Sequence, residues 1–316
     1  MMRRRFYSSI LIAAAIACGV VSSAHGQWGG REHELVIFAF SKTANDLRVV
    51  PGSFTNSGQL TIINPLSLPE TPLSPEFPAK RLRILHDEPG DFFAYGIHAE
   101  RADSPRQLRQ HPGKMLYISG MFRDQNPGSV SQRPLDVTAG LYFPMIPGVA
   151  AGPDVSLDES RFLLWTTASS TAPYVAVPFD TKSSVGPPGL TGAELEAVSG
   201  VAPFFVPWQN LRRRYPQDNW PDGMDVKVFD QDPLVGNTAM LIRLRPGKVT
   251  PPFIFTGNTH LFVLEGSAQL GLRAGDGLPV GLPVNWYAFI PKDFALRIAN
   301  ARVFTLPILR ESPSAE

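Results

Sequence analysis

The side chains best suited to hold a ligand by charge and hydrogen bonding lie in the first half of the chain. Gln107 and Arg109 stand two positions apart, so in a strand both point to the same side. A guanidinium beside a side-chain amide suits an anionic or carboxylate group. Strand alternation turns His98 away from Tyr95 unless a bulge at Gly96 intervenes. The alternative is a loop of solvated polar side chains.

Other reactive patterns fail on their local context. The Ser-Gly pairs at 119–120 and 199–200 lack the strand-to-helix turn that exposes a nucleophilic serine. The GPPG segment at 186–189 cannot bind phosphate through its backbone, because proline has no N–H to donate. The one cysteine, Cys18, lies in the N-terminal leader, so neither disulfides nor thiol chemistry are expected in the mature chain.

Residues 247–266 read GKVTPPFIFTGNTHLFVLEG, a spacing that resembles the first motif of the cupin superfamily, G-x5-H-x-H-x3/4-E-x6-G. The two terminal glycines keep the frame. Phe253 and Phe255 occupy the histidine positions, and Thr259 occupies the acidic position. The resemblance covers roughly residues 225–310 and implies a small antiparallel β-barrel.

The second motif of the family, G-x5/7-P-x-G-x2-H-x3-N, is also kept in part. Pro291 and Asn300 hold their positions, while Asp293 replaces the glycine and Leu296 the histidine. A divalent metal in such a barrel needs imidazole nitrogens and a carboxylate, and phenylalanine and leucine offer no lone pairs. We therefore expect neither a metal nor a cofactor. The apolar side chains either fill the barrel as core or line an apolar ligand cavity.

His260 adjoins the acidic position and fits the longer form of the motif. The segment VLEG, however, puts the final glycine of the motif at Gly266, which makes Thr259 rather than His260 the residue at the acidic position. Strand alternation then turns His260 to the opposite face, where we expect it to be structural.

The mature chain reads as β throughout. Short segments rich in β-branched and aromatic residues alternate with Gly, Pro, Asn and Asp clusters, and proline makes up 31 of 316 residues. Together with the resemblance, this predicts an all-β fold of two cupin-like jelly-roll barrels, mostly antiparallel. The expected parts are a signal peptide at 1–26, an N-terminal degenerate cupin-like domain at 27–168, a Pro/Gly-rich connection with a short helix at 169–223, and a C-terminal cupin-like barrel at 224–316.

An internal repeat supports this division. ILHDEPG at 84–90 parallels VFDQDPL at 228–234, LYISG at 116–120 parallels FVLEG at 262–266, and YFPMIP at 142–147 parallels WYAFIP at 286–291. The shared order and near-constant offset predict a duplication. By the same offset, the motif positions of the first half are Gln107, Arg109, Gly113 and Gly152.

The N-terminus predicts export. Three arginines at 3–5 precede a short apolar stretch at 10–21 and small residues near 22–26, the pattern of a signal peptide and too short for a membrane span. We expect a secreted or periplasmic protein. Lipidation at Cys18 is the alternative, disfavoured because Ala15 stands where that signal wants leucine. The mature chain carries 26 Lys plus Arg against 28 Asp plus Glu, with no basic stripe, so nucleic acid is not an expected partner.

These observations favour a non-catalytic module that binds a small molecule or a partner protein of the cell envelope. One alternative is a metal-independent cupin-type enzyme, an epimerase, isomerase or lyase using His, Tyr or Arg side chains. Another is a structural barrel that packs or dimerises, since homodimers are a tendency of the family. The candidate pocket residues are His98, Gln107, Arg109, Tyr117, Phe253, Phe255, Thr259 and Leu296.

Overall fold

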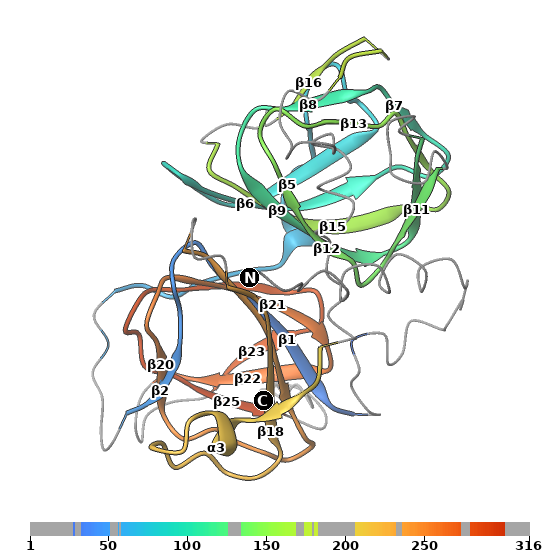
Figure 1. The fold of residues 1–316 in the computed structure, drawn as a ribbon. Coiled ribbons are helices and arrows are strands. Elements are labelled where there is room, and N and C mark those ends of the chain that lie inside the picture. The colour runs from blue at the N-terminus through green and yellow to red at the C-terminus, as the bar shows by residue number, and fades with distance from the viewer. Residues whose placement is uncertain are drawn as a thin grey trace, which may run out of the picture.

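The computed structural model shows two jelly rolls built almost entirely from antiparallel strands (Figure 1). It describes residues 28, 33–50, 56, 58–125, 134–168, 174–178, 180–182, 206–231, 236–272 and 279–300. Helical structure in this part of the chain comprises the 3-10 turn η1 and the short helix α3, at Pro65–Ser67 and Leu211–Arg214. Among the described helices, none has the length and apolar character needed to cross a membrane. The all-β expectation is confirmed; the helix expected within 169–223, near 191–200, lies outside the described residues.

The larger layer of the N-terminal jelly roll is a six-stranded sheet in the order β12-β9-β15-β6-β5-β4. Two smaller sheets, β11-β10-β14-β7 and β13-β8-β16, face it across the interior. The bounds, in chain order, are β4 Thr71–Pro72, β5 Lys80–Glu88, β6 Asp91–His98, β7 Asp103–Ser104, β8 Gln107–Arg109, β9 Gly113–Ser119, β10 Met121–Asp124, β11 Leu135–Thr138, β12 Tyr142–Met145, β13 Ala150–Ala151, β14 Asp154–Ser156, β15 Ser160–Thr166 and β16 Tyr174–Ala176.

The C-terminal jelly roll has a seven-stranded sheet in the order β17-β18-β19-β1-β21-β24-β3, with the smaller sheets β2-β20 and β23-β22-β25. The sheets keep free edges, so both units are jelly rolls rather than closed barrels. The bounds are β1 Leu35–Ser41, β2 Leu47–Val49, β3 Thr61–Ile63, β17 Gln209–Asn210, β18 Met224–Gln231, β19 Thr238–Leu244, β20 Phe253–Phe255, β21 Thr259–Glu265, β22 Ser267–Gly271, β23 Val280–Pro283, β24 Tyr287–Ile290 and β25 Arg297–Asn300.

The first three strands of the chain complete the C-terminal jelly roll. β1 pairs with β19 and β21, β2 with β20, and β3 with β24; Figure 1 shows the blue β1 and β2 among the orange strands. β1 reads LVIFAFS and is buried at every position, the pattern of a central strand covered on both faces. The expected domain at 27–168 placed these strands in the first half, and their hydrogen bonds move them to the second.

Three apolar clusters hold the molecule together. One fills the N-terminal jelly roll and includes Phe92 and Phe162. A second fills the C-terminal jelly roll. The third draws on the larger sheets of both units, with Tyr95 and Trp165 from one and Phe262 from the other. Because burying one large apolar side chain contributes about 1.5–3 kcal/mol, this third cluster, here called the interface core, joins the jelly rolls firmly.

Strand pairing supports the internal repeat. The order β5-β6-β15-β9-β12 in the first unit matches the order β18-β19-β1-β21-β24 in the second. The matching strands β5 and β18 also have a register shift at the same place, before His86 and before Asp230. Gly120 and Gly266, in matching positions, have φ of +77° and +76°. An added Cβ at either would collide with the backbone at the start of β15 or β1 respectively. Thus β1 fills the place in the second unit that β15 fills in the first.

Candidate binding site in the N-terminal jelly roll

His98, at the end of β6, is the centre of a buried polar group inside the N-terminal jelly roll. It pairs across the sheet with Lys80 on β5 and Ser160 on β15. Its Nε2 lies 3.1 Å from Oγ of Ser104 on β7. All four polar side chains are buried, and His98 shares its face of β6 with Phe92, which belongs to the interior cluster.

Lys80 forms a buried ion pair with Asp154 on β14. Nζ of Lys80 lies 2.6 Å from Oδ2 of Asp154. Removing two charges from water is costly, and loss of one partner would leave the other charge uncompensated. The pair therefore depends on both members and lies beside His98, the cross-strand neighbour of Lys80.

Gln107 and Arg109 on β8 are both buried. The guanidinium carbon of Arg109 lies 5.8 Å from the ring centre of Phe143, a cation–π distance, and Phe143 belongs to the interior cluster. The two side chains thus face the same interior, as their spacing predicts. Oε1 of Gln107 and Oγ of Ser160 are buried, and neither has a hydrogen-bond partner within the described chain.

Tyr117 on β9 belongs to an aromatic wall of this interior. Its ring centre lies 4.9–5.9 Å from those of three phenylalanines. Tyr95 points the other way, into the interface core. The pairing of β6 with β15 runs through Gly96 without a bulge, so His98 and Tyr95 lie on opposite faces, as strand alternation predicts.

Burial, and secondarily the positive charge of Lys80, lowers the pKa of His98 to about 3. The imidazole is therefore neutral at pH 7 and a weak proton acceptor there. A neutral imidazole donates one hydrogen bond and accepts another. The side chain can orient a polar group, but it supplies no charge and little basicity.

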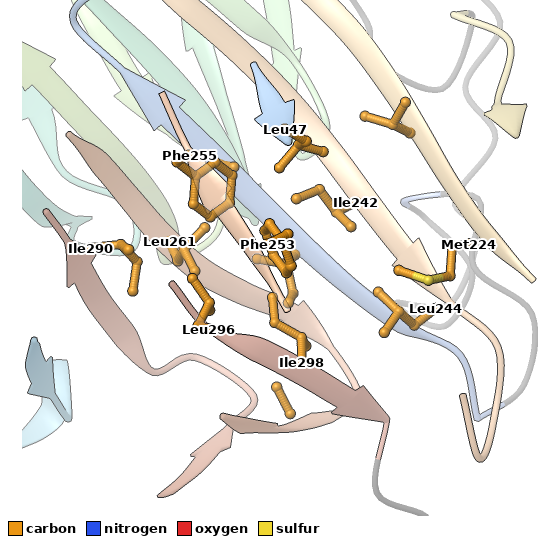
Figure 2. Close-up of a cluster of buried hydrophobic side chains, with 14 of the residues drawn as sticks. Leu47, Met224, Ile242, Leu244, Phe253, Phe255, Leu261, Ile290, Leu296 and Ile298 are labelled. Carbon is orange, nitrogen blue, oxygen red and sulfur yellow. The ribbon is translucent and has the colours of Figure 1, made fainter. Parts of the chain in front are cut away.

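The C-terminal jelly roll is filled by an apolar core (Figure 2). The ring centres of Phe253 and Phe255 on β20 lie 5.3 Å apart. Leu296 and Phe253 exchange two backbone hydrogen bonds of 2.9 Å. Thr259 is buried on β21, where its Oγ1 accepts from Nδ2 of Asn45 at 2.9 Å. These four candidate residues pack as core and support of this unit.

Six polar residues of the N-terminal centre match apolar residues of the C-terminal core, and Ser104 matches the polar Thr250. The β5–β6 pairing corresponds to β18–β19, β15–β6 to β1–β19, and β8 to β20. β14 corresponds to β25, because the hydrogen bond between Ile298 and Thr250 in the second unit lies at the place of the strand pairing between Asp154 and Ser104 in the first. The matched residues, polar member first, are His98 and Leu244, Lys80 and Met224, Asp154 and Ile298, Ser160 and Leu35, Gln107 and Phe253, and Arg109 and Phe255.

Sequence reasoning missed four members of this centre. None of them carries a motif, and each stands in a short segment that reads as an ordinary strand or turn: Lys80, Ser104, Asp154 and Ser160. The repeat offset could have found Lys80 and Asp154, whose counterparts 144 residues later are apolar. It could not have found Ser160, because its counterpart lies in β1, far from the repeat frame.

A second buried polar group joins the two jelly rolls. His260 on β21 is fully buried, with Nε2 3.1 Å from Oδ1 of Asp91 and Nδ1 2.8 Å from the hydroxyl of Tyr287. Nε1 of Trp165 donates to the same Asp91 oxygen at 2.9 Å. Nζ of Lys42 lies 3.5 Å from the other oxygen. His260 faces away from the C-terminal core, as alternation predicts.

A scan of protein-family models and a search of curated proteins find no match for the chain. Among solved structures, a protein of Nostoc punctiforme provisionally assigned as a dioxygenase superposes with a TM-score of 0.54 at 13% identity, over 82% of this chain and 84% of that one. The solved structures that resemble the chain in this way have the cupin fold. The chain has the cupin fold.

Two further cupin-fold structures are similar over most of the chain. A variant of Bacillus subtilis oxalate decarboxylase has a TM-score of 0.49 at 11% identity, over 78% of this chain and 74% of that one. A 7S globulin of Momordica charantia has a TM-score of 0.45 at 12% identity, over 76% and 80%.

The cupin motif positions can now be placed in both units. Gln107 pairs with Ala151 as Phe253 pairs with Leu296, so the counterpart of Leu296 is Ala151 and not Gly152, which the sequence offset indicated. The shift of one residue arises where the two units differ in loop length. Within the described ranges, no group of three or more His, Cys, Asp or Glu side chains is placed to hold a metal ion.

Proposed function

We propose that this is a secreted or periplasmic, non-catalytic binding protein whose N-terminal cupin-fold unit holds a small organic anion. One observation carries the proposal: six residues of the polar centre occupy positions that the same fold, in the same chain, fills with apolar side chains in its second unit. Burying such groups is costly. Since the architecture does not require them, we attribute them to ligand binding.

The chemistry of the centre supports an anionic ligand. Arg109 stays charged at all accessible pH values and presents a planar fork suited to a carboxylate, and it is 6% exposed. Gln107, on the same face, adds an amide. Tyr117 and its phenylalanine neighbours offer an apolar wall for the carbon skeleton.

A binding role is favoured over metal-independent catalysis by the state of His98. A general base acts best with a pKa near the working pH, and burial holds the pKa of His98 at about 3. Its partner on β7 is a serine hydroxyl, which does not raise basicity as a carboxylate would. His98 therefore suits hydrogen bonding to a bound group better than proton abstraction.

Metal ions, common in this fold, do not fit the motif positions of either unit. In the C-terminal unit these positions hold Phe253, Phe255 and Leu296, buried in the apolar core, and Thr259, whose hydroxyl is hydrogen-bonded to Asn45. In the N-terminal unit a cationic Arg109 occupies one of them and would repel a metal ion. We therefore assign no step to a metal.

The proposal is tested by thermal unfolding of the purified chain against a panel of small organic acids and their neutral amides. A ligand at about a hundred times its Kd stabilises the folded state by about 2.7 kcal/mol, a shift of several degrees. We expect acids to stabilise and amides not to. Arg109→Met should abolish the shift, whereas Arg213→Met, an exposed arginine on α3, should keep it. Equal shifts for acids and amides, or an unchanged shift in Arg109→Met, would overturn the proposal.

A further inference from the structure

Two buried oxygen atoms define what the ligand must offer besides its anionic group. Oε1 of Gln107 and Oγ of Ser160 lie in the N-terminal interior, and neither finds a hydrogen-bond partner within the described residues. Gln107 is 4% exposed and Ser160 is 0% exposed. Leaving a buried polar atom unpaired costs about 1–3 kcal/mol, so such atoms indicate a bound water or ligand.

The two atoms have different chemistry. The amide oxygen of Gln107 can only accept a hydrogen bond, so its partner must be a donor. The hydroxyl of Ser160 can accept or donate. Neutral His98, the cross-strand neighbour of Ser160, adds a second side chain that can both donate and accept a hydrogen bond. A ligand hydroxyl suits both atoms, because it can donate to Gln107 and either donate to or accept from Ser160.

Gln107 lies beside the anion-binding Arg109 on β8. Gln107 and Arg109 are alternate residues of β8 and face the same way, so their side chains leave the strand roughly 6.6 Å apart. The matched residues of the second unit, Phe253 and Phe255, fill the same space with two touching rings. One small molecule can therefore meet Arg109 and Gln107 together.

We infer that the ligand of the N-terminal unit is a hydroxylated organic acid, held through its anionic group by Arg109 and through a hydroxyl by Gln107. This inference rests on the proposed function and narrows it to one chemical class. Charge alone would favour any small acid, whereas the need for an anionic group at Arg109 and a hydroxyl at Gln107 favours acids with a hydroxyl near the carboxylate.

Binding of six compounds in two size-matched sets tests this inference by calorimetry at pH 7. The three-carbon set is glycerate, propionate and glycerol; the six-carbon set is gluconate, hexanoate and sorbitol. We expect the hydroxy acid of one set to bind at least about tenfold tighter than both of its companions, in line with one charged and one neutral hydrogen bond.

Gln107→Met keeps the side-chain length and removes the acceptor. This variant should bind the hydroxy acid about tenfold more weakly and bind the unsubstituted acid with unchanged affinity. The control Gln59→Met, at an exposed position, should change neither affinity. An unfolding midpoint at or above that of the unmodified chain will show that Gln107→Met folds.

The outcomes separate the inference from the proposed function. If the plain acid and the hydroxy acid bind equally, or if Gln107→Met weakens both alike, the hydroxyl requirement is overturned and anion binding stands. If sorbitol or glycerol binds as well as the acids, the anionic requirement and the proposed function both fail. If none of the six compounds binds, water molecules are the hydrogen-bond partners of Gln107 and Ser160, and the assignment of a hydroxy acid is overturned. The panel of organic acids and amides described above still decides the proposed function.

Discussion

At the scale of single residues, the two halves use the same positions for opposite purposes. Phe255 is fully buried in the C-terminal core, and its counterpart Arg109 faces the N-terminal interior. A phenylalanine there supplies packing and no lone pair, and an arginine supplies a fixed charge. Substitutions at matched positions should therefore affect different properties of the molecule.

Phe255→Ala should destabilise the protein without altering ligand binding. Truncating a fully buried phenylalanine removes apolar contact and leaves a cavity, which costs about 3–5 kcal/mol. Unfolding in urea, followed by tryptophan fluorescence, measures the loss. Leu66→Ala, at a residue 57% exposed, should fall within about 0.5 kcal/mol of the unmodified protein. A small loss for Phe255→Ala would mean that the core around β20 is not packed as described.

The buried ion pair offers a sharper residue-scale prediction. Lys80→Met and Asp154→Ile reproduce Met224 and Ile298, their counterparts in the second unit. Each single change should cost about 3–5 kcal/mol because it strands a buried charge, while the double change should be neutral or stabilising by about 1–4 kcal/mol. A double-mutant cycle by urea unfolding measures both. If the double change is as damaging as the singles, the fold itself requires the polar centre, and the centre no longer indicates a bound ligand.

At the scale of elements, the pattern of the sequence predicts the strands better than their partners. Alternation predicts that His98 and Tyr95 lie on opposite faces and that Gln107 and Arg109 share one, and the structure agrees. Alternation is local, because successive side chains on any strand point to opposite faces. Which strands pair is a long-range property, so the move of β1 into the second unit leaves no local sign beyond its unbroken apolar run. The last part of the expected C-terminal barrel, residues 301–316, lies outside the described residues.

The junction between β1 and β21 depends on a glycine. Gly266 has φ of +76°, and an added Cβ would lie 2.8 Å from the carbonyl oxygen of Glu34, just before β1. Gly247 has a similar φ of +71° with nothing within 4 Å. Both alanine variants therefore carry the cost of positive φ, about 1 kcal/mol, and only Gly266→Ala adds a clash with backbone. Urea unfolding should show the larger loss for Gly266→Ala; equal losses would mean that β1 can shift to make room.

At the scale of the whole molecule, the interface has a pseudo-twofold polar arrangement. Oδ2 of Asp230 in the C-terminal unit accepts from Tyr142 at 2.7 Å and lies 3.0 Å from Nζ of Lys114, both in the N-terminal unit. Asp91 in the N-terminal unit contacts His260 of the other, which in turn bonds Tyr287. β9 matches β21 and β12 matches β24, so Lys114 corresponds to His260 and Tyr142 to Tyr287, one residue later than the repeat of 142–147 with 286–291 indicated. The two carboxylates are not equivalent, because Asp230 corresponds to His86. The contact thus resembles a symmetric dimer interface within one chain.

The polar junction at His260 responds to acid, because the ordinary pKa of a histidine lies in the mildly acidic range. Burial lowers the pKa of His260 below its ordinary 6.5, against the opposing effect of Asp91. Burial alone would raise the pKa of Asp91, but hydrogen bonds from His260 and Trp165 outweigh it and lower that pKa to about 2. Protonated His260 would also lie near Lys42 and the ring of His86, 5.2 Å away.

The sign of the pH dependence follows from these shifts. Because the folded pKa of His260 lies below the unfolded value, its contribution is complete above pH 6.5 and is lost as pH falls below it; that of Asp91 is lost between pH 3.8 and about 2. His98, lowered to about 3, adds a loss of the same sign. Unfolding free energies in urea should therefore be level from pH 8 to 7 and fall from pH 6.5 to 4. His260→Gln and His98→Leu should each flatten part of this slope, and only His260→Gln should remove the accompanying change in Trp165 fluorescence. A slope unaffected by both variants would place the titrating groups elsewhere in the molecule.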